Sequence, residues 1–542
     1  MGAARRAAAG DVGFTAGMTL ISGRSRPRPR APWSLPLPTR TRGHRFGARY
    51  FHHVEHELTK DSDTFGVPGD NENGVIGWGT SWRMQGYLLM AERTGNPVYA
   101  GRLAGIVDRV LAARDDERGS RDHRGRSAPV WSTAGKFTAA TAAVPDESGA
   151  VALEVTVCPP RAVDAVVTVA PEDGGDRFTL TVTGKGRPAC TVEGLSLDPA
   201  DPRRADRVLY EAYDQRTAVT GRLLARDGAQ GPSPLRSPAP RRVRAGEYSV
   251  QPARVALAAQ TGMIAYPIAG LVRLARTGRS RAVPPAVRAR LDGYLDAVRR
   301  AVAAHDHQWQ PVADRRGCYR WLPDEPVSFA GAELPTNEFL AMGRTLVHLA
   351  ALTGEEEYAE RAAAMARSLK ADLARRDGAA VWPYWPAFGR VHNGWTATGS
   401  PATDGSGVRP SYAPVTAPED VTHALIDLDF LHLYHCQPPG TVPPVFTDSD
   451  LRAVATTFTR HVVAGQGPLG GDPGQRPRMR HDVSGDGRPG TDREQAHVAA
   501  WLPLRAWSPE LAALVLAVQP AAPPPPVMGV DTYCGALLAR WG

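Results

Sequence analysis

The chain has 542 residues, of which 42% are hydrophobic and 22% are charged. This balance is ordinary for a globular protein and excludes wholesale disorder or a collagen-like sequence. The length corresponds to two or three domains, or to one large repeat domain with an insertion. No apolar run approaches the ~20 residues that a membrane-spanning helix requires, so we expect no membrane span.

The net charge of +8 comes from 64 Lys and Arg against 56 Asp and Glu. Almost all of the cations are arginines, which together with 55 Gly and 48 Pro is the actinobacterial-type composition of a GC-rich genome. The basic balance is therefore weak evidence for nucleic acid, and we expect no nucleic-acid partner. The chain has no CxxC pair, P-loop, Rossmann fingerprint, nucleophile elbow or HExxH motif. We predict neither a cofactor nor a bound metal.

Residues 1–45 are rich in Arg and Pro and cannot bury enough apolar surface to order themselves, so we expect a disordered extension. Arg5 and Arg6 precede a mildly apolar stretch, as in a twin-arginine signal, but Asp11 and several glycines interrupt it. The sequence leaves the compartment open, cytoplasmic or exported.

An internal repeat is the strongest signal in the chain. Thr94, Gly95 and Tyr99 recur as Thr353, Gly354 and Tyr358, each time between two stretches with helical periodicity. The expected first helices are 82–93 and 338–352, and a looser third copy pairs 265–276 with 286–304. A glycine at the end of the first helix accepts the left-handed conformation of a helix terminus. Further hairpins are expected over 421–463 and 493–518.

One helical hairpin cannot bury its apolar face alone, so neighbouring hairpins must stack. The spacing is too long and irregular for a TPR or HEAT solenoid. We therefore predict a mainly α fold, a closed (α/α) toroid formed by residues 46–147 and 251–542. Residues 148–250 contain short β-branched runs at 151–157, 166–169 and 178–182, which predict an inserted antiparallel β unit and linker.

Polar and aromatic residues gather where the first helices of the repeats begin. Alignment of the copies places Trp78, Thr261 and Asn337 at equivalent positions, at helix starts that meet at one mouth of the ring. Unpaired N–H groups and a partial positive charge at such helix starts suit anionic ligands. N-capping by these residues is the alternative explanation.

Residues 418–427 are the strongest candidate for a catalytic segment. On a helix, Glu419, Asp420 and His423 would share one face, and carboxylates beside a histidine raise its basicity for general-base or metal-ligand work. Tyr384, in the preceding loop, is a candidate proton donor. Acidic residues at a helix start also act as plain caps, which is the alternative. Aromatic planes beside such a cluster are typical of sugar binding, and the tryptophans concerned are Trp78, Trp321, Trp382 and Trp385.

The hairpin repeats, the Trp-Pro-Tyr-Trp loop at 382–385 and the Glu-Asp-Val-Thr-His segment at 419–423 resemble the six-hairpin glycosidase-like (α/α) toroid superfamily. This superfamily includes uronate C5-epimerase C-terminal domains, polysaccharide lyases and unsaturated-glycan hydrolases. The resemblance implies a carbohydrate-active enzyme, a lyase or epimerase, that abstracts the C5 proton of a uronic acid in a glycan.

By that resemblance, His423 and Tyr384 form the acid/base pair. Asn337 and Arg344 face the substrate carboxylate, whose neutralisation stabilises the developing enolate.

Three alternatives stay open from the residues. A glycoside hydrolase of the same fold would use two carboxyls, Glu338 with Glu419 or Asp420. The protein could instead be a toroid that binds a glycan or a protein without catalysis. Helix capping would then explain all of the polar residues. An isoprenoid cyclase would rely on the acidic pair Asp427 and Asp429.

Overall fold

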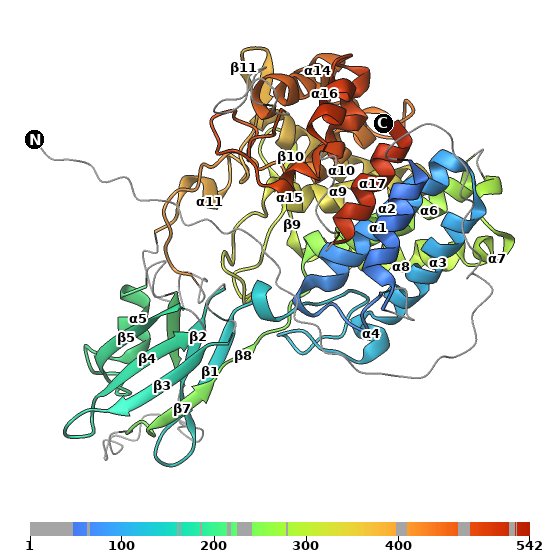
Figure 1. Ribbon diagram of the computed structural model, residues 1–542. Helices are drawn as coiled ribbons and strands as arrows, with labels where there is room; N and C mark the ends of the chain where they lie inside the picture. Colours follow the sequence, from blue (N-terminus) through green and yellow to red (C-terminus); the bar gives the residue numbers. More distant parts are fainter. Residues whose placement is uncertain are drawn as a thin grey trace, which may run out of the picture. The chain divides into compact units, whose positions relative to one another are not determined.

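The computed structural model (Figure 1) describes residues 47–541 except 62–65, 160–161, 163, 185–186, 214–217, 225–240, 278–279, 397–408, 464–476, 520–525 and 527. The extension expected over residues 1–45 lies outside the described residues. The described chain is mainly α, with one inserted β unit, as the sequence predicts.

Six elements form the inner ring of the helical part (Figure 1). In ring order they are α2 (Ser81–Thr94), α6 (Ala258–Arg276), α9 (Thr336–Thr353), α13 (Ala424–His435), η7 (Val498–Ala506) and α17 (Gly529–Trp541). Each packs on the next, and α17 packs back on α2, so the ring is closed. Both α6 and α9 are buried on nearly every face, which is expected of helices surrounded by other helices.

A second layer of helices covers this ring. Amphipathic helices pack on the inner ones: α3 (Pro97–Ala112) on α2, α8 (Leu291–Ala303) on α6, and α10 (Glu356–Asp372) on α9. Around η7 lie α14 (Asp448–Thr457), η6 (Phe458–Val462) and α16 (Leu511–Val518). The alternation of inner and outer helices is that of an (α/α) toroid, and the predicted fold class is confirmed.

The repeated Thr-Gly motif does end the inner helices. Gly95 and Gly354 follow α2 and α9 in the left-handed conformation, with φ of 67° and 71°. A side chain at either position would strain the backbone, which explains why glycine stands in both copies. The third copy ends differently, because Thr277 after α6 is extended with φ of −89°.

The sequence patterns missed the last inner helix, α17, and the helix that packs on its outer side. Helix α1 (Ala48–Thr59) packs on α17, so the first and last described helices of the chain are neighbours. Neither carries the repeat motif. Their pairing depends on tertiary packing over almost the whole chain length, to which local periodicity is blind.

The inserted β unit consists of two four-stranded antiparallel sheets that share one hydrophobic core. One sheet has the order β6-β2-β1-β8: Val219–Leu223, Val151–Val157, Ala140–Pro145 and Gln251–Pro252. The other has the order β5-β4-β3-β7: Arg187–Leu195, Phe178–Gly184, Val166–Pro171 and Gly246–Ser249. Helix α5 (Ala205–Glu211) packs on β6. Alternate residues of β1 to β4 point into the core, as half-buried strands require.

The unit is longer than the sequence predicts. Strand β1 begins at Ala140, inside the segment 46–147 that we assigned to the toroid, and helix α6 begins only at Ala258. The Ala-rich run of β1 has no β-branched signal apart from Thr141 and Val144, which is why the alternation escapes notice.

Short elements fill the connections between the helices. They are α4 (Asp115–Arg118), α7 (Pro285–Arg288), α11 (Arg390–Asn393) and α15 (Asp492–Gln495), with the hairpins β9 (Trp309–Val312)–β10 (Arg316–Tyr319) and β11 (Ala374–Arg376)–β12 (Ala379–Val381). Single turns of helix lie at η1 (Glu72–Gly74), η2 (Ile76–Thr80), η3 (Gly135–Phe137), η4 (Ser280–Ala282) and η5 (Asp306–Gln308). The hairpin β11–β12 leads directly into the 382–385 loop.

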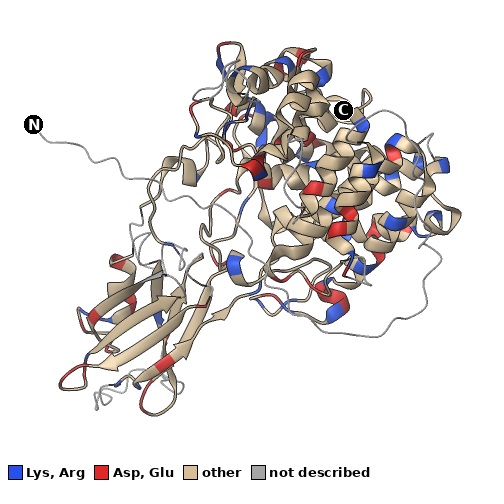
Figure 2. Ribbon diagram, viewed as in Figure 1, with Lys and Arg blue, Asp and Glu red and all other residues tan. Residues whose placement is uncertain are grey.

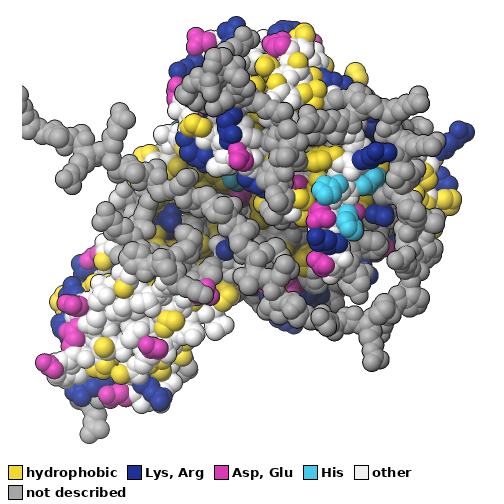
Figure 3. Space-filling view, in the orientation of Figure 1, with side chains coloured by type: hydrophobic (Ala, Val, Ile, Leu, Met, Phe, Trp, Pro, Cys, Tyr) yellow, Lys and Arg dark blue, Asp and Glu magenta, His cyan; other side chains and the backbone are white. Residues whose placement is uncertain are grey.

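Charged residues are interspersed over the helical part, with both signs on most helices (Figure 2). Figure 3 shows histidine side chains gathered over α1, where His53 and His56 are exposed. They lie beside acidic and basic side chains on a solvated helix face. No helix among the described residues is both long and apolar enough to span a membrane.

Candidate functional site: an acidic cluster at the start of the inner helices

The loop 382–385 joins two distant parts of the chain by backbone hydrogen bonds. Tyr384 donates its N–H to Ala417 at 3.0 Å and accepts from the N–H of Thr336 at 3.0 Å. Glu419 donates its N–H to Trp382 at 2.9 Å. Because Thr336 opens α9, the loop fixes residues 417–420 beside the first turn of that helix.

This arrangement brings six of the predicted residues into one cluster, which we call the acidic cluster: Asn337, Glu338, Tyr384, Glu419, Asp420 and His423. The Asn337 amide donates to Glu419 Oε2 at 3.0 Å, although the two residues are 82 positions apart. The Tyr384 and His423 rings meet edge to face, with centroids 5.3 Å apart. The side chains at the start of α9 and before α13 therefore form one site.

The segment 419–423 is not helical, contrary to the sequence prediction. Helix α13 begins at Ala424, and Asp420 forms an isolated bridge with Asp482. Asp420 Oδ1 accepts the N–H groups of Thr422 at 2.8 Å and His423 at 3.0 Å. These bonds hold the backbone in a turn, since a short carboxylate competes with helical bonding. The capping role that we weighed for Asp420 is real, and its other oxygen is left for His423.

Asp420 and His423 form a tight acid–imidazole pair, with His423 Nδ1 2.5 Å from Asp420 Oδ2. Burial alone would lower the pKa of His423, but the charge and hydrogen bond of Asp420 raise it above its usual value. For Asp420 the opposite holds: burial raises its pKa, and His423 more than offsets this, holding the pKa far below the usual range. Asp420 is therefore ionised at neutral pH, and its charge favours the protonated form of His423.

Glu419 and Asp427 form a second pair behind the first. Glu419 is fully buried, and burial raises its pKa well above the usual value, with the charge of Asp427 adding to the effect. Burial also raises the pKa of Asp427, against the hydrogen bond that Trp382 Nε1 donates to its Oδ2 at 2.8 Å. Two carboxyls this close titrate as a pair and share a proton at neutral pH.

Glu338 is the carboxyl at the front of the cluster. Its side chain is half-buried on the first turn of α9, and burial raises its pKa to about 7, with His423 opposing the rise. Tyr384 has a pKa far above its usual value because of burial and the nearby charge of Glu338. Tyr384 therefore keeps its proton at neutral pH, and Glu338 keeps its proton up to about pH 7.

Aromatic rings extend from the cluster in one direction. Trp385 contacts Tyr384 edge to face at 5.6 Å, and Trp321 contacts Trp385 at 6.1 Å. Trp321 and Trp385 are 9% and 7% exposed, so most of each ring packs within the fold. Trp78 lies in η2 beside Gly74 and Gln260, at the start of the neighbouring inner helix α2. Trp382 acts through its hydrogen bond to Asp427.

Arg344 does not join the cluster. It is seven residues after Asn337 on α9, which places it about 10 Å further along the helix axis. Fully buried there, it donates to Gln85 at 3.1 Å and to Asp429 at 2.8 Å. The family resemblance assigned Arg344 to the substrate carboxylate, but a resemblance cannot show how deep in the ring a side chain lies.

The ligand atoms of Glu419, Asp420 and His423 lie within 4.8 Å of one another, a spacing that suits a cation. It is the one such group of His, Cys, Asp and Glu residues within the part of the chain that the structure describes. The Asp420–His423 hydrogen bond already occupies one ligand atom of each residue.

No protein-family model and no curated protein sequence matches the chain. Three solved structures match weakly. Two are inactive variants of an alpha-1,6-mannanase of Salegentibacter sp. HEL1_6, bound to alpha-1,6-mannotetrose and alpha-1,6-mannotriose. They share 13% and 11% identity with this chain, over 52% of it and 74% and 75% of their own lengths, at TM-scores of 0.30 and 0.31.

The third match is a mutant of a reducing-end-xylose releasing exo-oligoxylanase, with 12% identity over 53% of this chain and 66% of its own, at a TM-score of 0.29. None of these three is a lyase or an epimerase by its description. At TM-scores near 0.3 the likeness says nothing of substrate or reaction.

Proposed function

We propose that this protein is a carbohydrate-active enzyme that hydrolyses glycosidic bonds in a neutral glycan. Glu338 is its proton donor and Asp420 its ionised carboxylate. One observation carries the proposal: two carboxyls of the same cluster are held in opposite protonation states, with the pKa of Glu338 raised by burial to about 7 and that of Asp420 held far below its usual range by His423.

Glycoside hydrolysis needs this asymmetry. The departing oxygen must receive a proton, while a negative charge faces the oxocarbenium-like transition state and either attacks it or activates water. Glu338 retains a proton up to neutral pH and is half-buried, so a bound sugar can reach it. Asp420, fixed by His423 and Thr422, supplies the negative charge in one orientation.

The remaining members of the cluster position these two groups. Glu419 is wholly buried and is held by Asn337 at 3.0 Å, so it acts through its neighbours rather than on the sugar. Tyr384 is neutral, and its hydroxyl suits donation to a sugar oxygen. The half-buried rings of Tyr384 and Trp78 suit the apolar face of a sugar.

The charge of the site favours a neutral sugar over a uronic acid. Asp420 and the Glu419–Asp427 pair together carry more negative charge than His423 offsets, and Arg344 is paired with Asp429 elsewhere. A substrate carboxylate would meet repulsion where the lyase or epimerase reaction needs neutralisation. The cyclase alternative is disfavoured too, since Asp427 bonds Trp382 and Asp429 bonds Arg344.

Proton abstraction at C5 stays the second candidate because of one contact, the 5.3 Å approach of the Tyr384 and His423 rings. A tyrosine beside a histidine is the acid/base pair that the lyase and epimerase reactions use.

The test is a reducing-end assay on neutral polysaccharides, including α-1,6-mannan and xylan, run with wild type, Glu338→Gln and Glu325→Gln. The control carboxyl of Glu325 also has a pKa raised by burial to about 7, but it bonds Gln308 and Leu322. We expect Glu338→Gln to lose about 100-fold or more of the rate and Glu325→Gln to retain it.

A parallel assay follows the absorbance of unsaturated uronides from uronate-containing polysaccharides. Turnover there, without release of reducing ends from neutral glycans, would replace hydrolysis with the C5 reaction. Binding of glycans with turnover in neither assay would support the non-catalytic alternative.

A further inference from the structure

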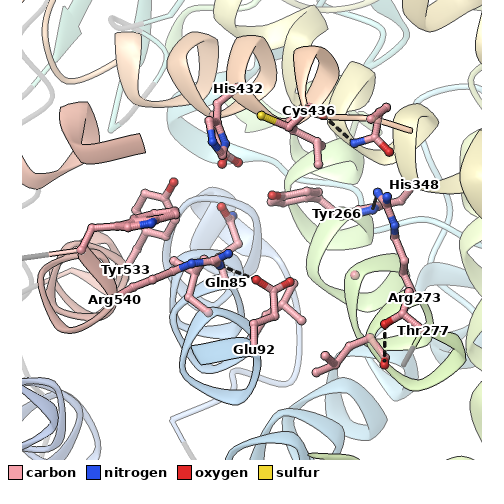
Figure 4. A pocket seen from close by; sticks show the side chains of 18 residues that line it. Gln85, Glu92, Tyr266, Arg273, Thr277, His348, His432, Cys436, Tyr533 and Arg540 are labelled. Carbon is pink, nitrogen blue, oxygen red and sulfur yellow. Dashed lines mark hydrogen bonds and ion pairs between the residues drawn. The ribbon is translucent and has the colours of Figure 1, made fainter. Parts of the chain in front are cut away.

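The ring has a cavity at the end opposite the acidic cluster. It has a volume of about 320 Å³ and is lined by the C-terminal halves of α2, α6, α9, α13 and α17 (Figure 4). His348, in its wall, is eleven residues after Asn337 on α9, which corresponds to roughly 16 Å along the helix. The cavity and the acidic cluster are therefore separate sites.

Most charges in the cavity wall are neutralised by a neighbour. Glu92 pairs with Arg540, and Asp429 pairs with Arg344 below the wall. Arg273 differs, since it forms no ion pair within the described parts of the chain. Its one hydrogen-bond partner there is His348 Nδ1, at 3.3 Å. The nearby charge of Glu92 acts on Arg273, but no described carboxylate lies at ion-pair distance from its guanidinium.

The contact with Arg273 fixes the tautomer of His348. A guanidinium only donates, so Nδ1 must accept, and burial keeps the pKa of this imidazole well below its usual value. The neutral ring then carries its proton on Nε2. That N–H is buried, with no acceptor among the described residues, in a side chain 5% exposed.

Gln85 supplies another unmatched donor. Its Oε1 accepts from Arg344 at 3.1 Å, so its amide N–H₂ faces away from that contact. Nε2 of Gln85 is buried and has no hydrogen-bond partner in the described structure, and the side chain is 1% exposed. Buried donors without acceptors are costly, so the lining of this cavity calls for a group rich in acceptor oxygens.

Aromatic rings form the other part of the lining. Tyr266 stacks on His348 with centroids 5.1 Å apart and 14° between the planes. Figure 4 shows Tyr533 and Arg540 on the side of the cavity facing Tyr266 and His348. A flat ring bound between these walls would place a substituent at Arg273.

We propose that this cavity is a binding site for a small ring compound bearing one carboxylate, which Arg273 binds together with the free donors of His348 and Gln85. A carboxylate is planar and monoanionic, so it matches the guanidinium fork and neutralises one charge. The cavity volume is enough for a single six-membered ring with its carboxylate. The site is independent of the reaction at the acidic cluster.

Isothermal titration calorimetry tests the proposal with two probes that share this chemistry, benzoate and D-glucuronate. Their neutral counterparts are benzyl alcohol and D-glucose. We expect saturable binding of one or both acids at millimolar concentration or below, and binding at least about tenfold weaker for the neutral compounds. Preference for benzoate would identify an aromatic ligand, and preference for D-glucuronate a hydroxylated one.

Two variants and a matched control locate the binding. Arg273→Met removes the charge with similar length, and Gln85→Glu keeps the acceptor for Arg344 while adding a repelling carboxylate. Each should weaken binding of the acid by about tenfold or more. The control is Arg276→Met. Arg276 lies one turn after Arg273 on α6, is exposed and pairs with Asp292, so this change should leave binding of the acid unchanged.

The proposal is overturned if neither acid binds, if the neutral compounds bind equally well, or if both variants fold and bind as wild type does. The Gln85→Glu arm keeps the test decisive should Arg273→Met fail to fold.

Discussion

The imidazole of His423 and the carboxylate of Asp420 share a 2.5 Å hydrogen bond between Nδ1 and Oδ2. The same carboxylate accepts two backbone N–H groups through its other oxygen, so Asp420 ends the loop and orients the histidine at once. Each partner stabilises the charged form of the other. The turn at residues 420–423 therefore determines which groups of the acidic cluster are charged.

Replacement of Asp420 by Asn removes the charge while keeping a group that can cap the turn. Burial then acts on His423 with only the charges of Glu338 and Asp427 opposing it, so we expect its pKa to fall below that in wild type. The measurement is the pH titration of the His423 ring signal by NMR, identified by its absence in His423→Asn. Asp448→Asn, which removes the carboxylate from the surface pair with His435, is the control and should leave that titration unchanged. An unaltered His423 titration in Asp420→Asn would show that the pair does not set it.

Glu338 should make the protein less stable as the pH rises. Burial raises its folded pKa from 4.5 to about 7, so the folded state holds a proton that the unfolded state has lost between these values. Stability from this group is present below about pH 4.5 and declines as the pH approaches 7. The loss is of the order of 1–3 kcal/mol.

Glu338→Gln should remove that decline, as measured by urea unfolding at pH 4.5 and pH 7.5. The same variant should remove the fall in hydrolysis above about pH 7, since a general acid must carry its proton. Glu325→Gln should change the stability slope but not the activity profile, because Glu325 has no contact with the acidic cluster among the described residues. A pH profile shared by both variants would contradict the role given to Glu338.

Chelation of metals should leave activity and thermal stability unchanged. The ligand atoms of Glu419, Asp420 and His423 are suitably close, but Asp420 Oδ2 and His423 Nδ1 already bind each other. A cation would have to break this bond and displace its proton. The experiment compares melting temperature and rate before and after EDTA, and then with added Ca²⁺, Mn²⁺ or Zn²⁺. A loss that one of these ions restores would establish a metal site instead.

Most of the fold could be predicted from the sequence because each repeat lies within one short stretch of the chain. Each Thr-Gly motif marks a helix end, and the periodicity on either side identifies both helices of a hairpin. The pairing of α1 with α17 was not readable, since it joins segments from the two ends of the chain. Closure of the ring was inferred correctly, but from the long and irregular spacing of the repeats and not from these two helices.

The site was readable only in part. The carboxylates and the histidine within residues 418–427 indicated a candidate catalytic segment. The structure does bring residues of this segment to Asn337, Glu338 and Tyr384. The helix assumed for 419–423 was wrong, because Asp420 uses its side chain to hold a turn. Arg344 was assigned by resemblance alone, and a resemblance carries no information on depth within the ring.

No sequence pattern indicated the cavity lined by α2, α6, α9, α13 and α17. Gln85, Arg273 and His348 come from three helices and form no motif. Their significance comes from donors left without acceptors, and this depends on side-chain packing that one-dimensional patterns do not contain.

Trp382 and Trp321 offer a matched test of what positions Asp427. Both are buried tryptophans, but Trp382 Nε1 donates to Asp427 at 2.8 Å, whereas Trp321 Nε1 has no hydrogen-bond partner among the described residues. Replacement by Phe removes similar volume at each position, so the packing losses should be similar. Trp382→Phe also leaves a buried carboxyl without its donor, so it should cost about 1–3 kcal/mol more in the free energy of unfolding. Denaturant titrations of both variants at pH 7 measure the difference. Equal losses would mean that the indole N–H contributes nothing to holding the Glu419–Asp427 pair in place.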